Sequence, residues 1–312
     1  MSVPRYGDAM SRQRRLLPVF ALLALLLGAC TADPGWPPQQ TNFELIPAPV
    51  NAEVVVGENR MLFNIYDRQN QPIAAPETAV ALRFFDLATS RTQPAAETPA
   101  TFTATIPGLP GLYRAEATFD KPGEWGVEAT ATAADGSKRS GRFVFPVRET
   151  GMTPRIGATA PASDNPTATT TDEIARISTD DDPDPDFYRE SVTQALSAHR
   201  PFAVVFATPA FCKSLTCAPT LDLVKASAAD YKDRMTFIHV EPYELELVDG
   251  GLRPVLSEEN LPISVLATQA WGLPTEPYVF VVDTAGRVTA KFEGIASAEE
   301  LREAFDGVAS PG

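Results

Sequence analysis

Two cysteines, Cys212 and Cys217, lie where a predicted buried strand gives way to a predicted helix. The run 202–207 is short, apolar and rich in valine and phenylalanine, which is typical of a buried strand. The helix should begin near Ala218, because Pro219 is tolerated in a first helical turn, where its missing N–H has no partner. Free N–H groups at a helix start stabilise a thiolate and lower its pKa from about 8.5 to roughly 3.5–7.5. The pair therefore predicts a redox-active disulfide.

The spacing of the two cysteines restricts the loop between them. Residues five apart on a regular helix are rotated by roughly 140° and lie beyond the Cα separation of about 7 Å that a disulfide allows. At least part of 213–216 must therefore be a loop or tight turn. We interpret Cys217 as the more acidic thiol and the nucleophile, because it is nearer the helix start, with Cys212 as its partner. The opposite assignment stays open.

The first thirty residues carry the pattern of an export signal. Four arginines precede an apolar run over 16–27, which ends in the sequence LGAC at Cys30. The apolar run is shorter than the roughly 20 residues that span a membrane. The LGAC segment resembles a bacterial lipobox, which implies cleavage before Cys30 and a lipid thioether on its sulfur. The resemblance predicts a lipid-anchored protein of the bacterial cell membrane that faces an oxidising, extracytoplasmic compartment.

Charge and cysteine content restrict the partners. The 312-residue chain has a formal net charge of −14, and loss of the arginine-rich signal would make it more negative. A surface this acidic repels nucleic acid and anionic lipid headgroups. Nucleic acid is therefore not an expected partner. Two cysteines besides Cys30 are consistent with one disulfide in an exported chain. We expect exported protein thiols or disulfides as substrates, together with an unidentified redox partner, and no cofactor or metal.

The chain divides by composition into five segments. They are a signal peptide (1–29), a proline-rich tether (30–41), a β-sandwich (42–148), a linker rich in Pro, Thr and Asp (149–185) and a second domain (186–308, with an entry segment from about 155). The acidic run 180–186 in the linker lacks the glycine and distal glutamate of a calcium loop, so we interpret it as solvated.

The segment 42–148 predicts an all-β domain. Seven β-type runs separated by turn signals are expected at 53–56, 61–66, 79–87, 101–106, 111–119, 125–133 and 142–147. The run GLYRAEATFDKPGEW resembles Ig-like sandwich domains of bacterial envelope proteins, some of which handle copper. This segment contains no His or Cys, and Met61 is its only methionine, so a copper site is not expected. A spacer or a partner-docking module is the expected role.

The second domain shows a strand–helix–strand order followed by a helix, a hairpin and a helix. The expected elements are helix 186–199, strand 202–207, helix 218–231, strand 235–240, helix 264–271, strands 278–282 and 287–292, and helix 297–305. The segments FAT…FC, CAP and WGLPTEPYVFVVD resemble the active-site and cis-proline segments of thioredoxins. The resemblance implies an α/β thioredoxin-like fold, with Pro277 as the cis-proline beside the cysteines. It also places the charge of Glu276 at the substrate groove.

The resemblance has departures that bear on chemistry. Four residues separate the cysteines instead of two, and Val204 stands where many thioredoxins carry a buried acid. Copper chaperones of the same fold carry a histidine where this chain has Thr284, so that copper ligand is missing. His239 could substitute, but we interpret it as a packed side chain at a strand end.

These observations predict a membrane-anchored thiol–disulfide oxidoreductase that uses Cys212 and Cys217. The alternative is a non-enzymatic binding or assembly module, with a structural disulfide or with a role in metal delivery to a respiratory complex. A low-pKa, titratable thiol favours the enzyme, whereas a buried inert bridge favours the module.

Overall fold

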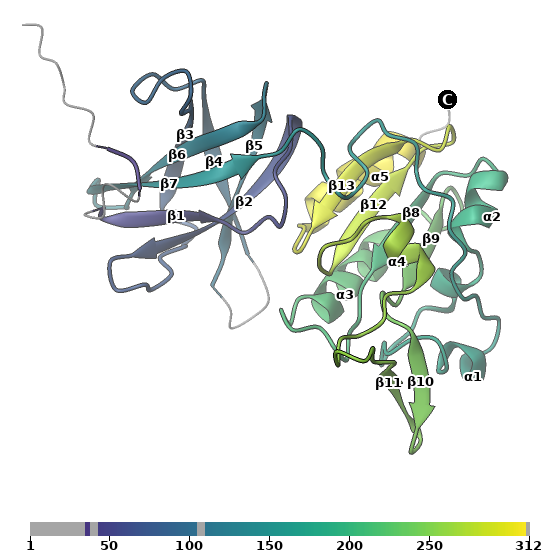
Figure 1. Cartoon of the computed structure of the whole chain (residues 1–312). Helices are drawn as coiled ribbons and strands as arrows, with labels where there is room; N and C mark the ends of the chain where they lie inside the picture. The colour runs from purple at the N-terminus through teal and green to yellow at the C-terminus, as the bar shows by residue number, and fades with distance from the viewer. Residues whose placement is uncertain (1–34, 38–42, 105–109, 310–312) are drawn as a thin grey trace, which may run out of the picture. The chain divides into compact units, whose positions relative to one another are not determined.

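The computed structural model describes residues 35–37, 43–104 and 110–309, which form two β-sheets, a separate hairpin and a set of short helices (Figure 1). Contacts group Pro34–Gly312 into one compact unit. The predicted signal peptide, Cys30 and most of the tether lie outside the described residues. Within those ranges, no helix is long and apolar enough to cross a membrane.

The N-terminal part of the chain folds into one seven-stranded antiparallel sheet with the order β1-β2-β5-β4-β3-β6-β7. Its strands are β1 (Leu45–Pro49), β2 (Gly57–Asp67), β3 (Ala79–Asp86), β4 (Ala96–Thr103), β5 (Leu112–Phe119), β6 (Gly123–Thr132) and β7 (Lys138–Val147). The predicted alternation in 111–119 is confirmed, because Tyr113, Ala115, Ala117 and Phe119 are all buried. Side chains from one face of each strand therefore fill the interior of this sheet.

The expected two-sheet sandwich is wrong, because β4 joins the two halves into one continuous sheet. The first part of β4, residues 96–100, pairs with β3, and the last part, residues 101–103, pairs with β5. The sheet then nearly closes on itself like a barrel, where the backbone N–H of Glu44 donates to the carbonyl of Ser140 (3.3 Å). Gly141 allows this approach, since a Cβ there would overlap the carbonyl oxygen of Leu45.

The interior of the barrel-like sheet is an aromatic cluster. Phe119 makes edge-on contacts with Trp125 (centroids 4.8 Å apart) and Phe84 (5.5 Å). All three side chains are almost fully buried. Aromatic pairs in this geometry add about 0.5–1.5 kcal/mol beyond the burial of their area, so the cluster is a main source of stability for this part.

The C-terminal part contains a four-stranded sheet with the order β13-β12-β8-β9. Its only parallel pair is β8 with β9, and the other pairs are antiparallel. The elements are η1 (Pro185–Tyr188), α2 (Val192–Ser197), β8 (Phe202–Phe206), α3 (Cys217–Ala228), β9 (Thr236–Val240), β10 (Leu245–Val248), β11 (Gly251–Pro254), α4 (Leu266–Ala270), β12 (Tyr278–Val282), β13 (Val288–Glu293) and α5 (Ala298–Ala309).

Helices pack on both faces of the four-stranded sheet. Ala203 and Val205 of β8 contact the apolar cluster that includes α3 and α5, whereas the neighbouring Phe202, Val204 and Phe206 belong to the cluster of α2 and α4. Every residue of β8 is buried. Such a strand reads as a continuous apolar run, which is why its position was predictable.

The predicted fold class, an Ig-like sandwich followed by an α/β thioredoxin-like domain, is not the observed one. The described chain is mostly β, with a nearly closed seven-stranded sheet and with helices that are mainly short. The helix expected over 186–199 is reduced to η1 and the six residues of α2. The stretch 241–261, for which no helix or strand was expected, contains the antiparallel hairpin β10–β11.

Part of the predicted linker 149–185 packs against the C-terminal sheet. It contains the short helix α1 (Thr171–Ile174), whose Ile174 is buried in the cluster beneath α3 and α5. Asp180, from the acidic run, forms an ion pair with Lys225 of α3 (2.8 Å). Asp184 pairs in turn with Lys232 (2.5 Å). The interpretation of the acidic run as solvated therefore holds for Asp181 and Asp182, which are exposed, but not for Asp180 and Asp184, which pair with lysines that follow the run in the sequence.

Candidate functional site

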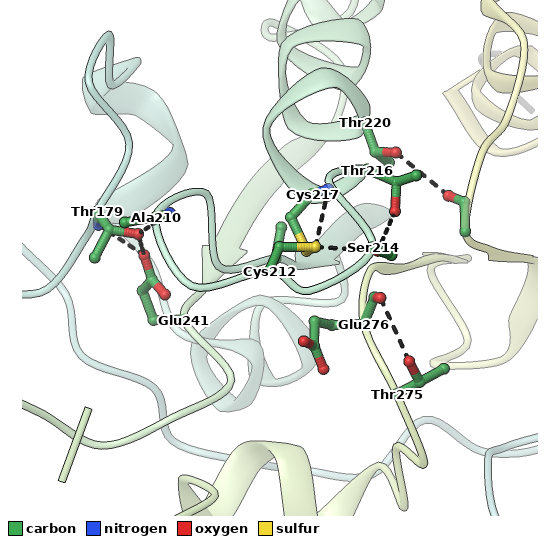
Figure 2. The surroundings of a disulfide bond; sticks show 12 residues. Thr179, Ala210, Cys212, Ser214, Thr216, Cys217, Thr220, Glu241, Thr275 and Glu276 are labelled. Carbon is green, nitrogen blue, oxygen red and sulfur yellow. Dashed lines mark hydrogen bonds between the residues drawn. A yellow bond between two sulfur atoms is a disulfide. The ribbon is translucent and has the colours of Figure 1, made fainter. Parts of the chain in front are cut away.

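Cys212 and Cys217 form a disulfide in a tight loop between β8 and α3 (Figure 2). Their Cα atoms are 5.9 Å apart, within the range that a disulfide requires. The loop turns at Leu215, whose φ of 62° lies in the left-handed region. Cys217 is the first residue of α3, so the predicted loop at 213–216 is confirmed. A turn at this point brings the two sulfurs together, which a continuous helix could not do.

Hydrogen-bond donors gather on the sulfur of Cys212. The backbone N–H of Cys217, at the start of α3, donates to Cys212 Sγ (3.3 Å). The hydroxyl of Ser214 lies 3.2 Å from the same sulfur and 2.7 Å from the hydroxyl of Thr216 (Figure 2). The expectation that Cys212 lies farther from the free N–H groups of the helix is therefore wrong. The loop folds back and places Cys212 in front of the helix start.

The two cysteines also differ in exposure. Both belong to the same apolar cluster, but Cys212 is 9% exposed, whereas Cys217 is 0% exposed. Exposed loop residues flank Cys212, including Lys213 and Leu215. Cys212 is therefore the sulfur that an incoming group can reach first.

Glu276 and Pro277 approach the disulfide from the segment before β12. The peptide bond between them is cis, as the resemblance implied for Pro277. The ligand atoms of Cys212, Cys217 and Glu276 all lie within 4.8 Å of one another (Figure 2). The carboxyl group of Glu276 thus lies beside both sulfurs.

Tyr243 holds the carboxylate of Glu276 in place. Its hydroxyl donates to Glu276 Oε2 (2.9 Å). Burial raises the pKa of Tyr243, and the hydrogen bond and negative charge of Glu276 raise it further, so the phenol keeps its proton. Sequence reasoning missed Tyr243, because 33 residues separate it from its partner.

A second group of polar residues anchors the beginning of the disulfide loop. Glu241, which follows β9, accepts hydrogen bonds from the backbone N–H (2.6 Å) and hydroxyl (2.5 Å) of Thr179. The hydroxyl oxygen of Thr179 accepts in turn from the backbone N–H of Ala210 (3.2 Å, Figure 2). This relay ties the loop to a segment thirty-one residues earlier, and no local pattern in the sequence signals it.

His239 is a packed side chain, as the sequence predicted. It is 3% exposed, and its Nε2 lies 2.9 Å from the carbonyl oxygen of Ala207, an acceptor only. Nε2 therefore carries the proton, and Nδ1 accepts from the hydroxyl of Tyr188 (2.9 Å). With both nitrogens engaged, His239 does not replace the missing copper ligand.

A groove of about 400 Å³ opens beside the disulfide loop. Its lining includes Ser214, Thr216 and Glu276 near the disulfide, together with Leu62, Asn64 and Tyr66 of β2. Its lining combines apolar surface with a few polar groups, which is common in sites that bind peptide or small-molecule ligands.

Comparisons with known proteins do not assign the chain to a family. No protein family matches it, and no curated protein matches it either. Among solved structures, the soluble domain of PmoD from Methylocystis is 17% identical over 30% of this chain and 75% of that one, with a TM-score of 0.20. A β-glucuronidase from Parabacteroides merdae is 13% identical over 36% and 15% of the two chains (TM-score 0.23). MtrC from Shewanella baltica is 14% identical over 47% and 28% (TM-score 0.24). Scores this low do not establish a shared fold.

Proposed function

We propose that this protein catalyses thiol–disulfide exchange with the Cys212–Cys217 pair. The observation that carries the proposal is the contact between the first N–H of α3 and Cys212 Sγ at 3.3 Å. In the reduced protein, the same N–H and the Ser214 hydroxyl would stabilise a Cys212 thiolate. The local resemblance of the cysteine and cis-proline segments to thioredoxin active sites supports the same chemistry.

These contacts favour Cys212 as the nucleophile, which reverses the order that the sequence suggested. The Cys212 thiolate attacks one sulfur of a substrate disulfide, and the other substrate sulfur leaves as a thiolate that takes a proton from water. Cys217 then attacks Cys212 Sγ in the mixed disulfide and releases the second substrate thiol. The substrate gains two electrons and two protons, and the protein pair returns to its disulfide. The reverse sequence oxidises a substrate dithiol.

Glu276 supplies an acid–base group for the second step. Cys217 is fully buried, and burial in apolar surroundings disfavours its thiolate. A carboxylate within 4.8 Å of both sulfurs can accept the Cys217 proton as this sulfur attacks. Many thioredoxins carry a buried acid at the position of Val204, and Glu276 would take the place of that acid as the proton acceptor.

The groove beside the disulfide is the proposed place for the substrate segment. Ser214 and Glu276 line it, and both lie near Cys212 Sγ, so a segment of an exported protein bound there would lie close to the disulfide. The negative charge of Glu276 favours substrates with basic residues near their cysteines.

We also propose that the chain is anchored to the bacterial cell membrane through a lipid on Cys30 and faces the extracytoplasmic side. The LGAC sequence after a basic and an apolar segment supports this anchor. The barrel-like sheet would then act as a spacer or docking module between the anchor and the disulfide.

The complete burial of Cys217 favours a second candidate, a structural disulfide in a non-enzymatic binding module. Equilibration with glutathione buffers of known potential separates the two. A catalytic pair is expected to have a reduction potential above roughly −300 mV. Structural bridges typically have reduction potentials below this value. A bridge that stays oxidised throughout the glutathione range would overturn the proposed exchange activity.

A further inference from the structure

Three side chains with metal-binding atoms converge at the disulfide. Each pair among Cys212 Sγ, Cys217 Sγ and a carboxylate oxygen of Glu276 lies within 4.8 Å. We propose that the reduced protein binds one Zn²⁺ ion through these three atoms, and that the disulfide abolishes the site. The inference relies on one part of the proposed function, namely that the bridge can be reduced.

The distances suit a tetrahedral ion after a small rearrangement. Zinc bonds to sulfur at about 2.3 Å and to oxygen at about 2.0–2.2 Å, so neighbouring ligand atoms lie roughly 3.5–3.8 Å apart. Reduction frees the two sulfurs to separate to this distance. Glu276 needs to approach by about an ångström. The exposed loop at 213–215 can absorb the movement of Cys212.

Contacts around the three ligands would orient them. Tyr243 donates to Glu276 Oε2 at 2.9 Å, which leaves Oε1 for the ion. The N–H of Cys217 and the hydroxyl of Ser214 contact Cys212 Sγ. Partners of this kind fix the direction of metal ligands, and their loss typically lowers metal affinity 10–100-fold.

The ligand types favour zinc over other metals. Two thiolates and one carboxylate give three negative charges, which a divalent cation offsets better than Cu(I) does. Hard cations such as Mg²⁺ and Ca²⁺ prefer all-oxygen sites, so the thiolates disfavour them. Three protein ligands leave a fourth position for water or an exogenous group, as in zinc sites that keep an open position. Glu276 also lines the groove of about 400 Å³, which gives that position an access path.

Oxidation would control the site directly. In the disulfide, each sulfur is bonded to the other, and neither is a thiolate ligand. Binding to the reduced pair releases two thiol protons, whereas oxidation of the zinc form releases the ion and two electrons. Zinc therefore stabilises the reduced state, and a more oxidising glutathione buffer should be needed to close the bridge when zinc is present.

The test uses the full chain with Cys30→Ser, so that only two thiols remain. A phosphine reduces the bridge, taking the oxygen of one water to become its oxide, and is then removed under anaerobic conditions. Thiols are counted, and Zn²⁺ affinity is measured by competition with a chromophoric chelator. Co²⁺ serves as a spectroscopic probe of thiolate coordination. We expect two thiols, one ion per chain, cobalt–thiolate absorption and no binding by the oxidised protein.

Substitutions test whether Glu276 supplies the carboxylate ligand of the zinc site. Glu276→Gln should weaken Zn²⁺ binding by at least tenfold, and Tyr243→Phe should weaken it less. Glu246→Gln, an exposed carboxylate on β10, is the matched control and should leave affinity unchanged. Two free thiols without zinc binding, or equal affinities for wild type and Glu276→Gln, would overturn the proposed site and leave the exchange activity standing. If no thiols appear after reduction, both proposals fail.

Discussion

The backbone N–H of Cys217 donates to the Sγ of Cys212 over 3.3 Å. The first residue of α3 thus directs its free donor at the other cysteine and not at its own sulfur. This contact sets the order of reactivity that we expect for the reduced pair.

The two thiols should differ in reactivity. Cys217→Ser should leave a Cys212 thiol with a pKa below about 8.5 that alkylates rapidly near neutral pH. Cys212→Ser should leave a buried Cys217 that alkylates at least tenfold more slowly, since it is 0% exposed. Rates of iodoacetamide labelling against pH measure both values. Faster labelling of Cys217 would return the nucleophile to the position that the sequence suggested.

The charge of Glu276 should oppose thiolate formation at Cys212. In the Cys217→Ser background, Glu276→Gln removes a negative charge within 4.8 Å and should lower the Cys212 pKa by a few tenths to one unit. The thiolate absorbance during a pH titration reports the shift. Glu246→Gln should give no shift. A raised pKa in Glu276→Gln would show that the carboxylate carries a proton and donates to the sulfur.

A buried ion pair links β2 to α5 and should matter for stability. Arg60 contacts both carboxylate oxygens of Glu300 (2.6 and 3.1 Å), and the side chains are only 10% and 6% exposed. Arg60→Ala should lower the free energy of unfolding by about 1.5–3 kcal/mol, because Glu300 loses its charge-assisted hydrogen bonds from Arg60 while Arg114 remains paired with it (3.0 Å). Urea unfolding measures the change. Glu97→Gln is the control, since its exposed pair with Arg83 should contribute only about 0–1 kcal/mol. Equal effects of the two substitutions would contradict the expected contribution of burial.

The same pair should make stability depend on pH. Burial acts to raise the pKa of Glu300, but the hydrogen bond and charge of Arg60 more than offset it and hold the pKa below its usual range. The resulting stabilisation is present above the unfolded carboxyl pKa of about 4.3 and is lost as pH falls through the lower folded value. The destabilisation caused by Glu300→Gln should therefore be greatest near pH 7 and shrink toward pH 3. A destabilisation that is constant over this range would refute the assignment.

The proposed lipid anchor depends on the sulfur atom of Cys30. Cys30→Ser should leave the precursor unlipidated and poorly processed, because only a thiol accepts the diacylglyceryl group. Cell fractionation with metabolic lipid labelling measures this. Cys212→Ser is the matched control and should still be lipidated. Mature, membrane-bound protein from Cys30→Ser would exclude the lipoprotein assignment.

Local patterns in the sequence predicted much of the C-terminal part. The strands at 202–207 and 278–282 were predictable because each is a continuous apolar run, and the structure places β8 and β12 there. The loop containing Cys212 followed from geometry, because a five-residue spacing on a helix forbids the disulfide. The global class was not predictable in this way. Whether β4 divides two sheets or joins them depends on which strands pair with it, and pairing is non-local.

The sequence by itself determined that two cysteines meet at a helix start, since this feature depends on near neighbours along the chain, whereas the cis-proline at Pro277 was expected only from a resemblance. The tertiary structure alone decided which sulfur receives the helix N–H, because a left-handed turn at Leu215 folds the loop back. It also decided that Tyr243 holds Glu276 and that Glu241 anchors Thr179, across 33 and 62 residues. Side chains this far apart meet only when the strands beneath them have packed, because hydrogen-bond partners are chosen by proximity in space and not by order in the chain.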